Sequence, residues 1–115
     1  MPLFASDRHS VLTLWINGEE IELVASETDH RLVGRCGGSR IRTPRDKTEI
    51  STRHLLIGSR LEYGVWIWRV MDLESTCGTR INGQRIKSLT WVEIKKEDRI
   101  RLGSSPEGRV TLVVL

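Results

Sequence analysis

The sequence predicts an all-β fold, a two-sheet β-sandwich, and two observations support this prediction. Apolar residues recur with period two, and no segment sustains the i, i+3, i+4, i+7 spacing of a core helix. Short apolar segments alternate with Gly, Pro, Asn, Asp and Ser, which is typical of a sandwich and not of an α/β fold. We therefore expect short strands that form a scaffold, with the functional loops at one end.

Two Asn-Gly pairs predict tight hairpins. The first, Asn17-Gly18, joins the alternating residues 11–16 to a second stretch that continues through Ile21 and Leu23. The second, Asn82-Gly83, joins residues 79–81 to residues 84–86. Further short strands are predicted at residues 31–34, 40–42, 54–58, 65–73, 91–94, 99–102 and 109–115.

The chain of 115 residues is long enough for one hydrophobic core. We expect a loosely ordered segment over residues 1–10 and a single domain over residues 11–115. No apolar run approaches the roughly 20 residues that span a bilayer, and the N-terminus lacks the apolar segment of a signal peptide. The chain ends on an apolar strand, residues 110–115, as expected for a domain excised from a longer protein.

Charge and cysteine spacing narrow the classes of ligand. A net charge of +3 and a pI near 9.2 favour an acidic partner, but the basic residues are scattered along the chain, which favours an anionic spot over a nucleic-acid groove. Cys36 and Cys77 have no Cys-x-x-Cys spacing and no His at ligand spacing. We therefore expect free thiols, no metal site and no cofactor.

Three loops carry residues suited to binding an anion. Residues 34–40 place an Arg among flexible glycines, as a backbone nest for an anion requires. Residues 49–54 contain two hydroxyls, a guanidinium and an imidazole, and residues 72–83 carry three hydroxyls before the second Asn-Gly pair. Glu49 is expected to be a solvated surface charge; if it instead borders a peptide groove, it should disfavour acidic residues in the ligand.

In order along the chain, these loops form a four-part pattern. It consists of Gly34-Arg35, then Ser51-x-x-His54, then Asp72-Leu73-x-Ser75-x-x-Gly78-Thr79-x-x-Asn82-Gly83, and then Lys96-Glu97-Asp98-Arg99-Ile100-Arg101-Leu102-Gly103. Together they resemble the signature of the forkhead-associated (FHA) family, with Glu97 in place of a Gly in the closing motif. Four ordered motifs are far more specific than any one alone. The resemblance, from about Leu32 to Gly103, implies an eleven-stranded β-sandwich whose apical loops bind phosphothreonine peptides.

The resemblance also implies roles for individual residues. The phosphate ligands would be Arg35, Ser51, Thr52 and Thr76. The residues that contact the peptide backbone would be Asn82 and Cys77. The residues that support the loops would be Gly34, His54 and Gly78, with His54 as a buried prop.

This chain departs from the family pattern at two of these positions. Cys77, a poor hydrogen-bonding group, replaces an Asn that is common before the Gly-Thr, which puts one peptide contact in doubt. Thr52 replaces a frequent Arg or Asn, and its hydroxyl can donate to phosphate but carries no charge. Arg53 and Arg40 are candidate substitutes.

Three other interpretations compete with this one. Ser51, His54 and Asp72 could form a catalytic Ser-His-Asp set, but no Gly-x-Ser-x-Gly elbow accompanies them, and we expect no enzymatic activity. The tryptophans could stack on single-stranded nucleic acid, although Trp66 and Trp68 in an alternating strand are better explained as core. The same fold could also serve as a phosphate-independent interaction or dimerisation scaffold.

The sequence therefore predicts a phosphothreonine-binding adaptor that recruits a phosphorylated partner protein in signalling. No small-molecule substrate, membrane or nucleic acid is expected as a partner, and a homodimer is left open. The family's commonest setting implies a nuclear protein, with the DNA damage response as one example, while a cytoplasmic location is the alternative.

Overall fold

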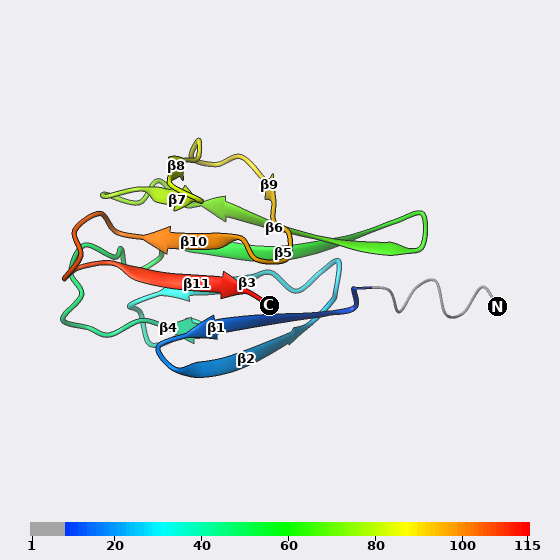
Figure 1. Ribbon diagram of the computed structural model, residues 1–115, viewed down its shortest axis with the longest axis horizontal. Helices are drawn as coiled ribbons and strands as arrows, with labels where there is room; N and C mark the ends of the chain where they lie inside the picture. The colour runs from blue at the N-terminus through cyan, green and yellow to red at the C-terminus, as the bar shows by residue number, and fades with distance from the viewer. Residues whose placement is uncertain (1–8) are drawn as a thin grey trace.

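Eleven strands run through residues 9–115, the part of the chain that this computed structural model describes (Figure 1). In order they are β1 (Val11–Ile16), β2 (Glu19–Val24), β3 (Arg31–Gly34), β4 (Ile41–Arg42), β5 (Leu55–Glu62), β6 (Val65–Asp72), β7 (Thr79–Ile81), β8 (Gln84–Arg85), β9 (Val92–Glu93), β10 (Arg99–Leu102) and β11 (Val110–Val114). None of these described residues lies in a helix, so they include no helix that could cross a membrane. The predicted all-β class is confirmed.

The strands form two sheets that pack face to face. One has six strands in the order β2-β1-β11-β10-β7-β8, and the other has five in the order β4-β3-β5-β6-β9. All neighbours are antiparallel except β3 and β4, which run parallel. This two-sheet sandwich is the predicted architecture.

The core fills the space between the sheets because the strands alternate buried and exposed residues. In β1, Leu12, Leu14 and Ile16 are buried while the intervening residues face outward. In β6, Trp68 is 5% exposed and belongs to the core, as predicted, whereas Trp66 is only half-buried. The Trp68 indole N–H donates to the carbonyl of His9, 2.7 Å away, and so ties down the start of the described chain. The rest of the predicted loose segment, residues 1–8, lies outside the described residues.

Both predicted Asn-Gly hairpins are present. Asn17 and Gly18 have φ angles of 49° and 83°, and Asn82 and Gly83 have 51° and 87°, as a type I′ turn requires. A third turn of this kind, at Tyr63-Gly64, joins β5 to β6 and was not predicted. It extends the strand expected over residues 54–58 as far as Glu62.

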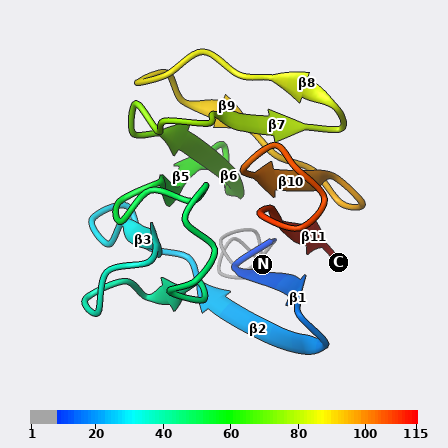
Figure 2. The same cartoon turned by 90° about the vertical axis from the view of Figure 1, so that its left-hand side faces the viewer.

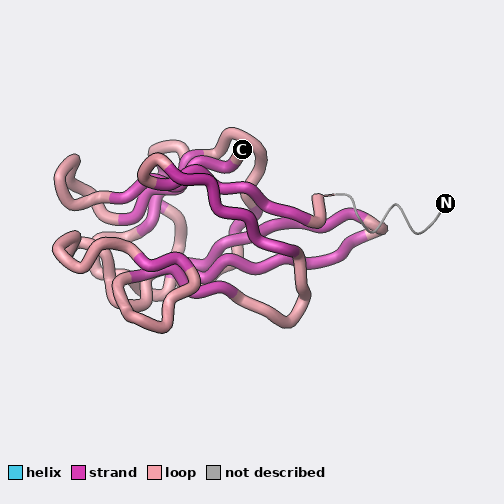
Figure 3. Tube along the Cα trace, turned by 90° about the horizontal axis from the view of Figure 1, so that it is seen from below, coloured by secondary structure: helices cyan, strands magenta, loops and turns pink. Residues whose placement is uncertain are grey.

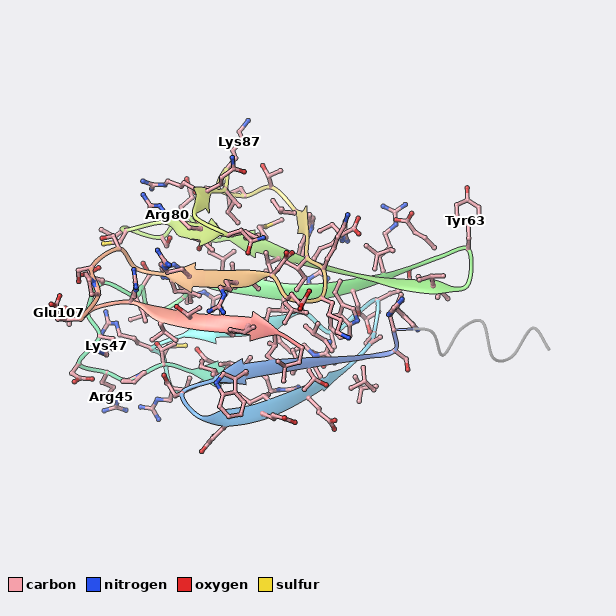
Figure 4. The ribbon with its side chains drawn as sticks, in the orientation of Figure 1. Arg45, Lys47, Tyr63, Arg80, Lys87 and Glu107 are labelled. Atoms are coloured by element: carbon pink, nitrogen blue, oxygen red, sulfur yellow. The ribbon has the colours of Figure 1, made fainter. Side chains whose placement is uncertain are left out.

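The loops of interest gather at one end of the sandwich, here called the apical end. Strands β3, β6 and β10 end there, and β5 and β11 begin there (Figure 1). Figure 2 looks onto this end, and Figure 3 shows most of the loops gathered at the same end of the two layers. The β5–β6 hairpin points the other way, so Tyr63 at its tip lies at the opposite end (Figure 4).

Candidate functional site: the apical loops

Gly34, at the end of β3, lets the loop of residues 51–54 approach the backbone closely. A Cβ at this position would lie 2.3 Å from the carbonyl oxygen of Thr52, which is closer than atoms can approach. The backbone N–H of Arg35 donates to the Ser51 carbonyl at 3.3 Å, and that of Cys36 donates to the Thr52 carbonyl at 3.1 Å. The sheet pairing thus continues into the loops and places Arg35 beside Ser51.

The Arg35 side chain is held at this junction by one hydrogen bond. Its Nε donates to the carbonyl of Ile50, a fully buried residue one position before Ser51. Among the described residues, neither Nη of the half-buried Arg35 has a hydrogen-bond partner, and neither is a buried unpaired atom. Arg35 forms no internal ion pair with the described residues, so its Nη groups face solvent and can donate to an anion.

His54 connects two of the apical loops from inside the protein. Its ring is fully buried, and Nδ1 accepts a hydrogen bond from the backbone N–H of Ser51 at 3.0 Å. Nδ1 is therefore unprotonated, so Nε2 carries the proton and donates to the carbonyl of Gly78, also at 3.0 Å. Burial lowers the pKa of His54, although the Gly78 carbonyl and the Asp72 carboxylate oppose this effect.

The Ser51 hydroxyl completes the link to the third loop. Ser51 Oγ accepts a hydrogen bond from the backbone N–H of Thr76 at 3.1 Å. The hydroxyl proton therefore remains available for donation. Three of the predicted phosphate ligands, Arg35, Ser51 and Thr76, are thus brought together, and the fourth, Thr52, is exposed next to Ser51.

Asp72 organises the loop that carries Thr76. It is buried at the end of β6 and accepts hydrogen bonds from the hydroxyls of Ser75 at 2.5 Å, Thr79 at 2.6 Å and Ser88 at 2.7 Å. Burial alone would raise the pKa of Asp72, but these hydrogen bonds outweigh it and hold the pKa below its ordinary value. The carboxylate therefore stays ionised and fixes the turn.

Gly78 is placed where only glycine fits well. Its φ is 81°, and a Cβ there would lie 2.7 Å from Nε of Arg85. Gly78, like Gly34 and His54, therefore lies at a junction between the apical loops and the sandwich.

Asn82 and Cys77 are placed differently from the predicted phosphate ligands. Strand β7 carries the chain away from Gly78, so Asn82, four residues later, lies about 13 Å further along the sheet. Its amide donates to Asp98 at 2.9 Å and accepts from the backbone N–H of Arg99 at 3.0 Å. These contacts hold the hairpin turn, and the structure does not bring Asn82 to the cluster formed by Arg35, Ser51 and Thr76.

Cys77 follows Thr76 directly, is half-buried and is a free thiol.

Glu49 differs from the solvated charge that the sequence suggested. Its carboxylate accepts hydrogen bonds from the backbone N–H groups of Ser104 and Ser105, both at 2.8 Å, and from their hydroxyls. These hydrogen bonds lower the pKa of Glu49 to about 2. The bond from the Ser105 hydroxyl has the largest effect, and those from the two backbone groups come next. Nearby, Lys47 Nζ donates to the carbonyl of Glu107. Both contacts tie residues 43–54 to residues 103–109, and partners 55 to 60 positions apart cannot be recognised from the sequence.

The catalytic interpretation of Ser51, His54 and Asp72 does not match the hydrogen bonds. His54 Nδ1 accepts from the Ser51 backbone, not from its hydroxyl, and Nε2 donates to a carbonyl. Neither ring nitrogen can take a proton from Ser51 Oγ. The described residues also contain no group of three or more His, Cys, Asp or Glu side chains that could hold a metal ion.

Cys36 lies beside Arg35 on the rim of the cluster. A hydrogen bond with the Ser39 hydroxyl, with a backbone contact at Gly38, lowers the pKa of this free thiol. The predicted free state of both cysteines holds in this structure.

Comparison with known proteins identifies the fold and the family. The FHA domain family model matches residues 31–103, and no curated protein sequence matches the chain. An FHA domain of a hypothetical protein from Arabidopsis thaliana is 27% identical, with a TM-score of 0.73, over 91% of this chain and 84% of that one. A structure from an analysis of phosphothreonine-dependent FHA domain interactions is 25% identical, with a TM-score of 0.68, over 90% and 94%.

The fold of the N-terminal FHA domain of Rad53p from S. cerevisiae, solved with a phosphothreonine peptide, is also similar. The TM-score is 0.75 at 20% identity, over 91% of this chain and 92% of that one. The family match covers more than half of the chain, includes all four motifs and agrees with the sandwich topology. This chain therefore belongs to the FHA domain family.

Proposed function

We propose that this domain binds a phosphothreonine peptide at the apical loops and so recruits a phosphorylated partner protein. The observation that carries the proposal is the convergence of Arg35, Ser51 and Thr76 from three separate loops. Phosphate at pH 7 carries close to two negative charges and three acceptor oxygens, so it needs several donors at one point. The solvent-facing Nη groups of Arg35 and the free hydroxyl proton of Ser51 supply such donors.

The rigidity of the cluster supports the same proposal. Ser51 is fixed through both its backbone and its hydroxyl, and His54 joins the loops from within. Little ordering of the loops is then needed on binding, which favours affinity. The Rad53p domain solved with a phosphothreonine peptide, the structure from an analysis of phosphothreonine-dependent FHA domain interactions, and the interaction role typical of FHA domains agree with a binding module.

Calorimetry with one peptide in phosphorylated and unphosphorylated forms tests the proposal. We expect binding only to the phosphothreonine form and loss of that binding in Arg35→Ala. The matched control is Arg60→Ala, because Arg60 is exposed, forms an ion pair with Glu62 and lies in the β5–β6 hairpin away from the apical loops. Equal affinity for the two peptide forms would instead favour a phosphate-independent scaffold.

A role in nuclear signalling is part of the proposal and follows from the family's commonest setting. Imaging of the tagged protein in its own cells checks the location. Exclusion from the nucleus would limit the proposal to cytoplasmic partners.

A further inference from the structure

The outer face of the six-stranded sheet carries a row of arginines. In β7 the buried Thr79 points inward and Arg80 points outward, and β10 alternates in the same way. The strand register places Arg80 directly opposite Arg101 on one side and Arg85 on the other. Arg99 lies two residues before Arg101 and points to the same face.

Within residues 9–115, no acidic side chain forms an ion pair with these arginines. Among the described residues, no carboxylate lies within ion-pairing distance of the guanidinium groups of Arg80, Arg85, Arg99 or Arg101. Like charges directly opposite each other on neighbouring strands are destabilising. An anionic ligand bound across the row would remove this repulsion. The row of arginines does not stabilise the isolated domain.

The row of arginines starts next to the candidate phosphate site. The Arg85 guanidinium lies over Gly78, as close as 2.7 Å to where a Cβ would be. The Gly78 carbonyl accepts from His54, and Thr76 is two residues earlier in the same loop. Figure 4 shows Arg80 in the apical half of the molecule, far from Tyr63.

We propose that this arginine row, defined as Arg80, Arg85, Arg99 and Arg101, binds the carboxylates of an acidic segment that flanks the phosphothreonine in the partner protein. This inference rests on the proposed function and specifies the partner further. The row from Arg85 through Arg80 to Arg101 crosses two strand spacings, about 10 Å. An extended peptide covers this distance in about three residues. The peptide must also cross from the phosphothreonine to Arg85, which lies over Gly78. The acidic residues should therefore lie within about five positions of the phosphothreonine.

Calorimetry with matched phosphothreonine peptides tests the inference. One peptide has neutral flanks, one has aspartates at alternate positions before the phosphothreonine, and one has them after it. On the unmodified domain we expect one of the acidic peptides to bind roughly 3- to 10-fold more tightly than the neutral one, as exposed ion pairs allow. The advantage should shrink in high salt.

The double variant Arg80→Gln/Arg101→Gln should lose this advantage while it binds the neutral phosphopeptide normally. The matched control is Lys95→Gln/Lys96→Gln, which removes the same charge from exposed residues before β10, at the end of that strand away from Gly103. The control should keep the advantage.

Several results would overturn the inference and not the proposed function. One is equal binding of acidic and neutral phosphopeptides by the unmodified domain, and another is an equal loss of the advantage in both double variants. A third is a dimer, seen by sedimentation, that Arg80→Gln/Arg101→Gln dissociates, since the row would then face Glu20 and Glu22 on the outer face of a second copy. Failure of every phosphopeptide to bind would instead reject the proposed function.

Discussion

Single residues determine whether the apical loops can meet, and Gly34 is the clearest case. It carries no side chain at the point where β3 and residues 51–54 touch, so the Arg35 and Ser51 backbones can pair. His54 then joins this pair to Gly78. The proposed phosphate ligands are thus positioned by residues to which no contact with the phosphate is assigned.

Gly34→Ala should weaken phosphopeptide binding more than its effect on folding explains. The added methyl group would clash with the Thr52 carbonyl, push residues 51–54 away from Arg35 and cost about 1–3 kcal/mol of stability. Calorimetry and urea unfolding of the same variant measure both effects. Gly37→Ala is the control, since a Cβ there meets no atom within 4 Å. Unchanged affinity in Gly34→Ala would contradict this account of the junction.

Asn82→Gly separates the structural contacts of this residue from its predicted peptide contact. Glycine keeps the φ of 51° but removes the hydrogen bonds to Asp98 and Arg99, so we expect a loss of about 0.5–1.5 kcal/mol. Because these contacts hold only the hairpin turn, we expect the phosphopeptide affinity of the variant to stay within about twofold of that of the unmodified domain. This corresponds to a change in binding free energy under about 0.5 kcal/mol. A large loss of affinity without unfolding would instead support the peptide-backbone role that the family resemblance implies.

At the scale of elements, the three type I′ turns differ in how well their first residue suits the turn. Asn17 and Asn82 occupy this position in two hairpins, while Tyr63 occupies it in the third with a φ of 50°. Asn tolerates the left-handed region far better than an aromatic residue. The β5–β6 hairpin therefore forms despite its turn, because β5 and β6 pair along their full lengths.

Tyr63→Asn should stabilise the domain by about 0.5–1 kcal/mol, because the turn then has the preferred Asn-Gly pair. The Tyr63 side chain is fully exposed, so no packing is lost. Thermal unfolding measures the change, and Asn17→Tyr is the reciprocal variant that should destabilise. A decrease in melting temperature for Tyr63→Asn would show that the tyrosine makes a contribution outside the turn.

At the scale of the whole molecule, buried and hydrogen-bonded ionisable groups make stability depend on pH. The pKa of His54 is lower in the folded protein than its ordinary value of 6.5, so the unfolded chain binds a proton first as the pH falls. Stability should therefore decrease as the pH falls below about 6.5. Urea unfolding at about pH 7.5 and about pH 5 measures this decrease.

The variant His54→Gln isolates this contribution. It should be less stable than the unmodified domain at about pH 7.5, and the gap should narrow toward about pH 5. His30→Gln is the control, because His30 is exposed and contacts Trp91 edge-on. A gap that does not change with pH would mean that His54 does not titrate differently on unfolding.

Glu49 should act in a lower and separate window. Its pKa is lowered from 4.5 to about 2 in the folded protein, so its contribution is complete above pH 4.5 and is lost as the pH falls toward about 2. Glu49→Gln should lower the unfolding midpoint at neutral pH and lose this dependence below pH 4.5. Persistence of the same acid transition in the variant would assign it to another carboxylate.

The sequence alone predicted much of the fold because its signals are local. Alternating Leu12, Leu14 and Ile16 indicate a strand within a few residues, and Asn17-Gly18 specifies its turn. Tyr63-Gly64 was missed because tyrosine carries no turn preference, so only strand pairing reveals the hairpin. The four ordered motifs were enough to identify the family.

Only the tertiary structure decided which side chains meet. Ser51 Oγ reaches the Thr76 backbone, 25 positions away, and Glu49 binds Ser104 and Ser105 at 55 and 56 positions. The arginine row likewise exists only through the register of β7, β8 and β10. Local propensities act over a few residues, whereas contacts across a sandwich depend on how whole strands are ordered and aligned. The composition of the loops was therefore readable in the sequence, and the family resemblance implied that they act together, but only the tertiary structure decided which hydrogen bonds join them.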